Sequence, residues 1–495
     1  MKTHNTSVVV GFSHPTLLSA TLCFAILVLT GCAGISKEAG FSAVQQEVDE
    51  RIGYRVQWNQ NTGADNEAAQ AVRELLDKPL TADTAVQIAL LNNRRLQANY
   101  EALGVAQSAV IDAGLLSNPI FHGVATFGLS DDEAVAEAKD DSTYTFEVEM
   151  DFLSIFYAPM RKSVAQAEFE AAKLRVTAAV IDLAGQTRKT FYRVQADGQM
   201  LDMFQQVVLA TQAGYEFAQK LQEAGNIPEL DLFLQRALYE RSRLKLAAAE
   251  VAEAESREAL NRLMGLWGQD TAWTVESRLP DIPADAMLLD DLEKQAIEKS
   301  IDLAIARQAI VSVGKQLRVE NTTKLVPVLD LGTEIEKEEG KWKAGPALGF
   351  VIPLFDRNQG RRAAAAAELR RQQQEYYALA VEIRSAARTA RRRLLTARRT
   401  ALFYQQEMLP LQASILDQVQ LEYNAMQIGT LRLLLAKQQE IDAGRGYIQS
   451  LLNYHIAKAE LDQILNGRLG VSTSTTPSME FRVPGASSTA NEGGH

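Results

Sequence analysis

The chain has 495 residues, of which 46% are hydrophobic and 23% are charged, and it carries a formal net charge of −11. This composition belongs to a folded protein rather than to a disordered one. The negative charge excludes the basic surface that phosphate groups require, so no nucleic acid is expected as a partner.

Residues 1–31 have the features of a signal peptide. A weakly basic start precedes a short apolar stretch, Leu17 to Leu29, that is too short to span a membrane as a helix. The stretch ends in the lipobox Leu29-Thr30-Gly31-Cys32, which predicts that acyl chains on Cys32 anchor the mature chain to outer-membrane lipid. An ordinary secretory signal with a chance match to the lipobox is the alternative. If Cys32 is acylated, residues 32–79 form an N-terminal, lipid-anchored segment.

Only two cysteines occur, Cys23 and Cys32. The first would leave with the signal peptide and lipid would consume the second, so the mature chain is expected to hold neither a disulfide nor a thiolate metal site. Histidines show no metal-ligand spacing, and no phosphate loop or nucleophile motif occurs. The sequence therefore predicts a protein that is not an enzyme and that has no cofactor and no resident metal.

The rest of the chain is a duplicated half-protein. Two copies of one pattern lie about 201 residues apart, so that Arg161 matches Arg362 and Met264 matches Leu465. A period this long is not that of a solenoid. We expect a first repeat over residues 80–267, a linker over 268–287, a second repeat over 288–467 and a disordered tail over 468–495.

Each repeat predicts the same elements. One helix, over about 81–113 or 288–321, is followed by two strands and then by a helix of unusual length, over about 158–224 or 358–424. A short break leads into a return helix. Alternating small residues, such as Ala167, Ala171 and Ala178, predict coiled-coil packing against neighbouring helices. A solitary hairpin surrounded by solvent is the alternative.

The prediction that the chain spans a membrane depends on its strands. Four strands are expected, over about 119–129, 143–153, 326–335 and 342–353. In the second strand, apolar residues alternate strictly with polar and acidic ones, as they do when one face meets lipid and the other a water-filled lumen. A half-buried soluble strand has the same period. The residues expected to face the lumen are Glu147, Glu149, Asp151, Asp330 and Glu334.

Four strands cannot close a barrel, and lipid does not tolerate an open sheet edge. Other copies of the chain must therefore complete the barrel. Three copies give twelve strands, although two or four copies would also close it.

These features resemble the TolC-like outer-membrane efflux factors over roughly Leu80 to Gly467. The marks are "LTADTAVQIALLNNRRLQA", "AGLLSNPIF", the two hairpin tips "AGNIPELDLFL" and "AMQIGTLRLLL", and the duplication itself. The resemblance implies a mainly α fold with a small β part, a homotrimer with a twelve-stranded transmembrane barrel, and a periplasmic helical tunnel. It also implies a periplasmic adaptor and an inner-membrane pump as partners. Within the family, it favours the metal-efflux CusC/CzcC type over drug export.

The resemblance implies a gate at the periplasmic hairpin tips. Family members often close this tip with acidic residues after the Gly-Thr of the second hairpin, whereas this chain has Leu435 and Gln438 there. Closure through leucines is therefore the hypothesis. The remaining candidate tip residues are Gly225, Asn226, Ile227, Pro228, Glu229, Asp231, Ile428, Gly429 and Thr430.

Two functions follow. The first is the passive outer-membrane channel of a tripartite efflux pump, which conducts metal cations or small toxic compounds from the periplasm to the exterior. The second is a structural or adhesive outer-membrane lipoprotein with a coiled-coil stalk and no transport. The strand alternation and the duplication favour the first.

Overall fold

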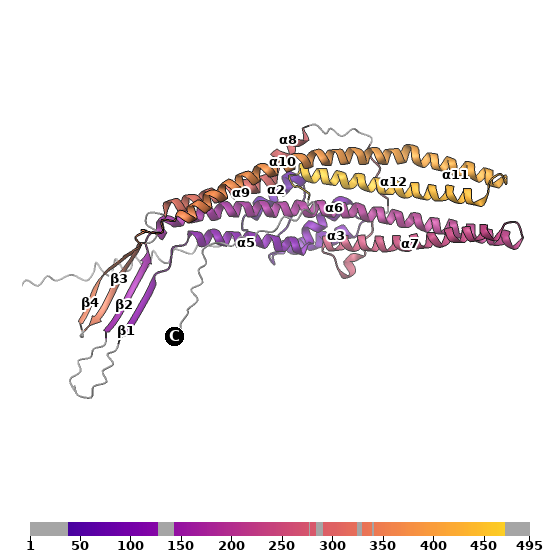
Figure 1. Ribbon diagram of the computed structural model, residues 1–495. Helices are drawn as coiled ribbons and strands as arrows, with labels where there is room; N and C mark the ends of the chain where they lie inside the picture. Colours follow the sequence, from indigo (N-terminus) through magenta and orange to yellow (C-terminus); the bar gives the residue numbers. More distant parts are fainter. Residues whose placement is uncertain are drawn as a thin grey trace, which may run out of the picture.

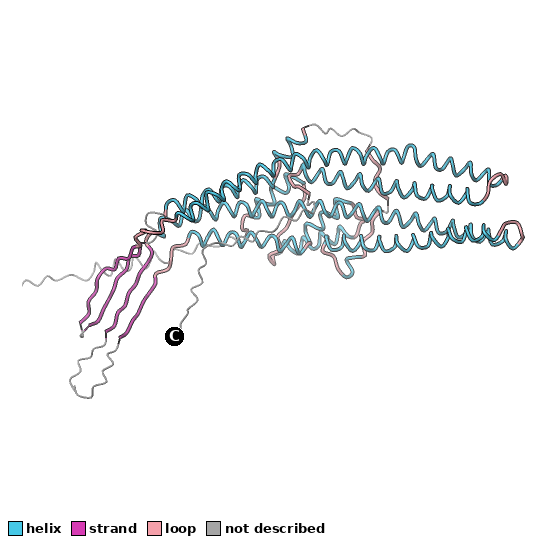
Figure 2. Tube along the Cα trace, in the orientation of Figure 1, coloured by secondary structure: helices cyan, strands magenta, loops and turns pink. Residues whose placement is uncertain are grey.

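The computed structural model describes residues 38–126, 143–276, 278–283, 291–323, 329–338 and 341–470. Over these residues the molecule is elongated, with a small sheet at one end and long helices in the remainder (Figures 1 and 2). The expectation of a mainly α protein with a small β part is confirmed. No helix in the described ranges is both long and apolar enough to cross a membrane. The predicted signal peptide and Cys32 lie outside the described residues.

The two halves contain the same succession of elements. After α2 (Phe41–Ile52) and α3 (Gly63–Leu76), the first half contains α4 (Ala82–Asn92), α5 (Arg94–Gly114), β1 (Ile120–Thr126), β2 (Thr143–Asp151), α6 (Ser154–Glu223) and α7 (Glu229–Met264). After a 3-10 turn (Gly268–Thr271), the second half contains α8 (Leu292–Glu298), α9 (Ile301–Thr322), β3 (Leu329–Glu338), β4 (Lys341–Phe350), α10 (Gln359–Phe403), a π turn (Tyr404–Met408), α11 (Leu409–Asn424) and α12 (Thr430–Leu465).

Each half begins with two helices where the sequence predicts one. The break falls at Asn93 in the first half and at Ser300 in the second, and both residues have an extended backbone. The Asn93 side chain accepts a hydrogen bond from the N–H of Leu96, and the Ser300 hydroxyl accepts one from Leu303. The single-helix prediction is wrong because Asn and Ser cap a new helix in preference to continuing the old one.

The long helix α6 has 70 residues, which corresponds to a length of about 105 Å at 1.5 Å per residue. Its buried positions are filled mainly by small side chains, and the predicted stripe members Ala167, Ala171 and Ala178 are among them. Small residues let neighbouring helices approach closely. The helix therefore packs along much of its length without a globular core.

The matching helix in the second half is α10 continued by α11, and the π turn lies between them. A π turn holds one residue more than an α turn. It ends two residues before Pro410, whose ring would clash with the carbonyl of Gln406 in a regular α-helix. The wider turn relieves this clash and lets the helix continue.

The extra residue sets the register between the halves. Before the π turn the halves align with an offset of 200, as Glu168 with Glu368, and after it with 201, as Ala224 with Ala425. The sequence match of Arg161 with Arg362 assumed one constant offset of 201. With the offset of 200 that holds before the π turn, Arg161 corresponds to Arg361 instead.

The long helices lie side by side in the order α7, α6, α12 and α10–α11 (Figure 1). The halves meet where α9 and α12 pack on α6. Arg468, three residues after the end of α12, joins them, because its Nε donates to Asp182 of α6 at 3.1 Å and its Nη1 donates to Asp302 of α9. The antiparallel sheet has the order β1-β2-β3-β4. One chain therefore has two outer edges, with β1 and α7 on one side and β4 and α10 on the other.

Candidate functional site: the acidic sheet face and the hairpin tips

Strand pairing brings the five predicted lumen carboxylates onto one face of the sheet. Glu147 lies opposite Glu334, and Asp151 lies opposite Asp330, across the β2–β3 pair. Glu149 lies between them on the same face of β2, because alternate residues of a strand share a face. These carboxylates come from β2 of the first half and β3 of the second half, so both halves of the chain contribute to the acidic face.

Glycines give these carboxylates room. Gly345 and Gly349 of β4 lie opposite Glu334 and Asp330 and carry no side chain that would cover them. At Gly332 of β3, a Cβ would lie 2.4 Å from the carbonyl oxygen of Val148, so only glycine fits there. The acidic face is therefore open rather than packed.

His122 also belongs to this face, although the sequence alone did not predict it. His122 of β1 lies opposite Glu147, and its Nε2 is 3.3 Å from Oε1 of Glu149. The alternation of the first strand, together with an antiparallel register, would have located it. Within the ranges that the structure describes, no cluster of three or more His, Cys, Asp or Glu could hold a metal ion.

The opposite face of the sheet is apolar and exposed. Phe146 of β2 stacks on Phe121 of β1 at 6.0 Å between ring centroids and on Trp342 of β4 at 6.4 Å. Leu331, Leu348 and other aliphatic residues continue the face, and they are exposed in a single chain. The sheet thus separates an aromatic, apolar face from an acidic one.

The hairpin tips lie at the far end of the molecule from the sheet (Figure 1). Gly225 turns the first hairpin with a left-handed φ of 74°, and Pro228 caps α7 with an extended backbone. At the second tip Met426 adopts the left-handed conformation. Asn226, Glu229 and Gly429 are exposed, and Ile227 and Ile428 are half-buried.

One hydrogen bond joins the two tips. Thr430 Oγ1, at the start of α12, donates to Asp231 of α7 at 3.1 Å. The next turn of α12 buries Leu433 and Leu434, whereas Leu435 is 55% exposed. Leu435 is therefore free to meet another copy or a gate, as the leucine hypothesis requires.

Acidic residues do follow the second tip, but they lie further along α12 than the predicted gate residues Leu435 and Gln438. Asp442 accepts a hydrogen bond from Gln438 at 3.0 Å and lies 3.7 Å from the Lys245 ammonium of α7. Burial, reinforced by Asp417, raises the pKa of the Glu440 carboxyl, and Lys437 opposes the rise. The predicted tip residue Gln438 thus belongs to a polar network with Asp442 and Lys245, which lies further from the tip than Leu435.

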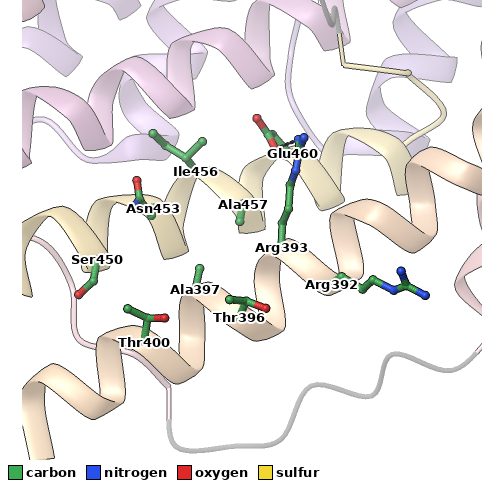
Figure 3. A pocket seen from close by; sticks show the side chains of 10 residues that line it. All are labelled: Arg392, Arg393, Thr396, Ala397, Thr400, Ser450, Asn453, Ile456, Ala457 and Glu460. Carbon is green, nitrogen blue, oxygen red and sulfur yellow. Dashed lines mark ion pairs between the residues drawn. The ribbon is translucent and has the colours of Figure 1, made fainter.

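A cavity of about 520 Å³ opens between α10 and α12 and was not predicted (Figure 3). Arg393 and Glu460 form an ion pair of 3.7 Å at its end. Threonine and alanine side chains make up much of the wall from α10, including Thr396 and Ala397.

Comparison with known proteins agrees with this architecture. Residues 85–266 match the family model of the outer membrane efflux protein. The chain is 23% identical over 395 residues to the cobalt-zinc-cadmium resistance protein CzcC of Cupriavidus metallidurans, a match that covers 78% of this chain and 90% of that protein.

Two solved channels share the fold. The crystal structure of CusC matches with a TM-score of 0.65 and 16% identity over 78% of this chain and 92% of that one. The outer-membrane channel OprN matches with a TM-score of 0.66 and 16% identity over 81% and 93%. The chain shares the fold of these channels, and residues 85–266 match the efflux-family model, in agreement with the resemblance seen in the sequence. The similarity to CzcC in sequence and to CusC in fold agrees with the predicted CusC/CzcC type and with the predicted outer-membrane location.

Proposed function

We propose that three copies of this chain form the passive outer-membrane channel of a tripartite efflux pump. The observation that carries the proposal is the two-faced sheet with two unpaired edges. A sheet with an apolar, aromatic face and an acidic face suits the boundary between lipid and water. Its edges β1 and β4 need partners, and three copies supply twelve strands.

In this arrangement the acidic face lines the lumen. Glu147, Glu149, Asp151, Asp330 and Glu334 would attract cations and repel anions. The helices α6, α7, α10, α11 and α12 would continue the duct into the periplasm, where the tips meet an adaptor and an inner-membrane pump. Acyl chains on Cys32 would act as an additional tether.

Metal cations are the substrate class that we propose, since the relative from Cupriavidus metallidurans is named for cobalt, zinc and cadmium resistance. The acidic face of the sheet is compatible with cations. Restoring growth of a strain that lacks the gene on zinc, cadmium, cobalt or copper salts would support this class. Restored growth on drugs alone would exclude it.

The rival function, an adhesive or structural lipoprotein without transport, is tested by planar-bilayer recording of the purified protein. We expect a stable, cation-selective pore. Replacing Glu147 and Glu334 by Gln should lower the cation selectivity measured from the reversal potential in a salt gradient. Glu74→Gln, in α3 and away from the sheet, should leave it unchanged. The absence of any pore would support the rival.

A further inference from the structure

One face of α10 carries a line of arginines that the proposed channel does not use. The helix holds eleven arginines and three glutamates, in a chain whose net charge is −11. Residues three, four and seven apart lie on one face of a helix, and six residues of α10 follow this spacing. We call this line the arginine stripe, and its members are Tyr377, Arg384, Arg388, Arg391, Leu395 and Arg399.

The arginine stripe is exposed and mostly unpaired. Its four arginines are exposed, and the Tyr377 side chain is 64% exposed. Among the described residues, only Glu293 of α8 forms an ion pair with the stripe, and it does so with Arg388 at 3.0 Å. The stripe therefore presents three guanidinium groups that no acidic side chain of the described residues neutralises.

The duplication shows that this face is covered in the first half of the chain. With the offset of 200, the stripe corresponds to a line on α6. Ala184, the counterpart of Arg384, is 8% exposed and packs in a cluster with residues of α2. Phe191, the counterpart of Arg391, is 2% exposed and packs in a cluster with a residue of α3. The N-terminal helices therefore cover on α6 the face that α10 leaves open.

The linker between the halves completes the cover on α6. Gln195 donates to the carbonyl of Glu276 at 3.1 Å. Gln199, the counterpart of Arg399, accepts a hydrogen bond from the N–H of Leu279 at 3.2 Å. On α10 the packed elements are mainly α12, α9 and α8, and no described element takes the place of α2 and α3. The arginine stripe is therefore a face from which the second half lacks its cover.

This face lies on the outer side of the helical layer. In the proposed channel the interior must stay open for the cargo, so α2 and α3 lie outside the duct. By the repeat, the arginine stripe faces outward as well. Its arginines lie about 38 to 60 Å from the start of α10, which follows the sheet. Under the proposed function, the stripe is therefore in contact with the periplasm and not with the cargo.

The chemistry of the stripe suits a polymer that carries carboxylates. A guanidinium group binds a carboxylate through two parallel N–H bonds. The arginines form a line about 22 Å long, which an extended chain can follow. The core of an interface with a folded protein is instead depleted in charge, and apolar contact is offered here only by Tyr377 and Leu395. Peptidoglycan is the extended periplasmic polymer whose peptide stems carry free carboxylates.

We infer that the arginine stripe of α10 binds the carboxylates of peptidoglycan peptide stems where the duct passes the cell wall. Arg384, Arg391 and Arg399 supply the free guanidinium groups, whereas Arg388 is held by Glu293 of α8. The inference takes from the proposed channel only the direction in which the stripe faces. It goes beyond that function, since conduction does not require the contact.

Co-sedimentation of the full-length protein in detergent with purified peptidoglycan sacculi tests the contact. The triple variant Arg384→Gln, Arg391→Gln, Arg399→Gln should bind about tenfold more weakly at low salt, because three exposed ion pairs are lost. Binding by the parent protein should also fall as salt is added, since salt screens exposed charges. Equal binding by the variant and the parent would overturn the inference.

A matched control removes the same number of charges far from the stripe. Three exposed arginines on the helical hairpins serve for it, as Arg236→Gln, Arg241→Gln and Arg432→Gln. This variant should sediment with the sacculi as the parent does. An equal loss of binding in the control would show attraction by net charge alone and would overturn the inference.

Sacculi whose carboxyl groups have been converted into neutral amides are the second probe. The parent protein should bind them about as weakly as the triple variant binds untreated sacculi, because the groups that the guanidinium ions recognise are gone. Undiminished binding to amidated sacculi would overturn the recognition of carboxylates.

Two further measurements distinguish other occupants of the stripe. A lowered trimer fraction of the triple variant in native mass spectrometry would assign the stripe to a contact between copies and overturn the inference. Unchanged binding to sacculi with lost co-purification of the adaptor would assign it to a protein partner, with the same consequence. A protein that binds sacculi through the stripe but forms no pore in planar bilayers would overturn the proposed channel alone.

Discussion

Thr430 of α12 donates a hydrogen bond to Asp231 of α7 at 3.1 Å, and this bond joins the tips of the two helical hairpins. Thr430 is buried, and the two residues come from different halves of the duplicated chain. The bond therefore holds the hairpins together where the predicted gate lies.

Removing this bond should loosen the tip. Thr430→Val keeps the shape of the side chain but deletes the donor, and a hydrogen bond to a carboxylate contributes about 1.5–3 kcal/mol. We expect more frequent open-channel events in planar-bilayer recordings. Thr430→Ser retains the donor and serves as the control, and equal opening by both variants would contradict the prediction.

Leu435 tests the hydrophobic closure of the gate. It is exposed beside the buried Leu433 and Leu434, so a change there leaves the contacts within one chain largely intact. Leu435→Ser should raise the conductance of the resting channel, because a polar side chain admits water to an apolar constriction. The matched control is Leu421→Ser, an exposed leucine in α11. Unchanged conductance after Leu435→Ser would remove the leucine hypothesis.

Arg468 should be the main electrostatic link between the halves. Its guanidinium binds both Asp182 and Asp302, and burial raises the pKa of the Asp302 carboxyl although Arg468 opposes the rise. Arg468→Ala leaves two partly buried carboxylates without a cation, which we expect to lower the free energy of unfolding by about 3 kcal/mol. Thermal unfolding in detergent measures this loss.

The control for Arg468 is Arg371→Ala. Arg371 pairs with Glu375 at 2.6 Å on the exposed surface of α10, where an ion pair contributes less than about 1 kcal/mol. A similar fall in melting temperature for both variants would show that the Arg468 link is not special.

Sequence periodicity predicted the faces of the sheet because a strand repeats every two residues. Phe146 and Glu147 could be assigned to opposite faces without knowledge of their neighbours, and strand pairing places each with like residues. The partner of His122 could not be predicted, because it depends on the register between strands rather than on the alternation within one.

Helix interruptions were harder to predict. Asn93 and Ser300 fit a helical pattern on either side, and only their capping hydrogen bonds reveal the break. The hydrophobic pattern does not reveal the π turn before Pro410, because the helix continues beyond it. It becomes evident only when the registers of the two halves are compared.

The environment of His455 should make the folded protein less stable at acidic pH. Its ring lies 4.6 Å from that of Tyr192, and Nε2 donates to the carbonyl of Pro280 at 2.9 Å. Burial lowers the pKa of the imidazole below its ordinary 6.5, Lys458 lowers it further, and the Pro280 carbonyl opposes the change. The folded state therefore prefers the neutral ring, and stability present above pH 6.5 is lost as the pH falls, because the unfolded chain takes up the proton first.

The measurement is the melting temperature between about pH 7 and about pH 5, where this group changes charge in the unfolded chain. The loss is at most about 1.4 kcal/mol per pH unit. His455→Gln can still donate to Pro280 but does not titrate, so its melting temperature should fall less across the window. Burial raises the pKa of the Asp462 carboxyl, so at lower pH its protonation favours the folded state and opposes the effect of His455. Identical slopes for the two proteins would refute the assignment to His455.

Gly446 should be required for the packing of the π turn. A Cβ at this position would lie 2.7 Å from two ring carbons of Tyr404 and from its hydroxyl oxygen, so Gly446→Ala forces the Tyr404 side chain to move. We expect a loss of about 1–2 kcal/mol in the free energy of unfolding, the usual cost of overpacking. Tyr404→Ala in the same chain should remove the clash and make Gly446→Ala neutral or favourable.

Gly314, inside α9, is the matched control for Gly446, because a Cβ there meets nothing within 4 Å. Gly314→Ala should stabilise the protein by about 0.5–1 kcal/mol, since alanine loses less backbone freedom in a helix. The two glycine-to-alanine changes are chemically identical, so opposite signs in thermal unfolding isolate the contact with Tyr404. If Gly446→Ala stabilises the chain as Gly314→Ala does, the Tyr404 ring is free to move away and the π turn does not depend on this glycine.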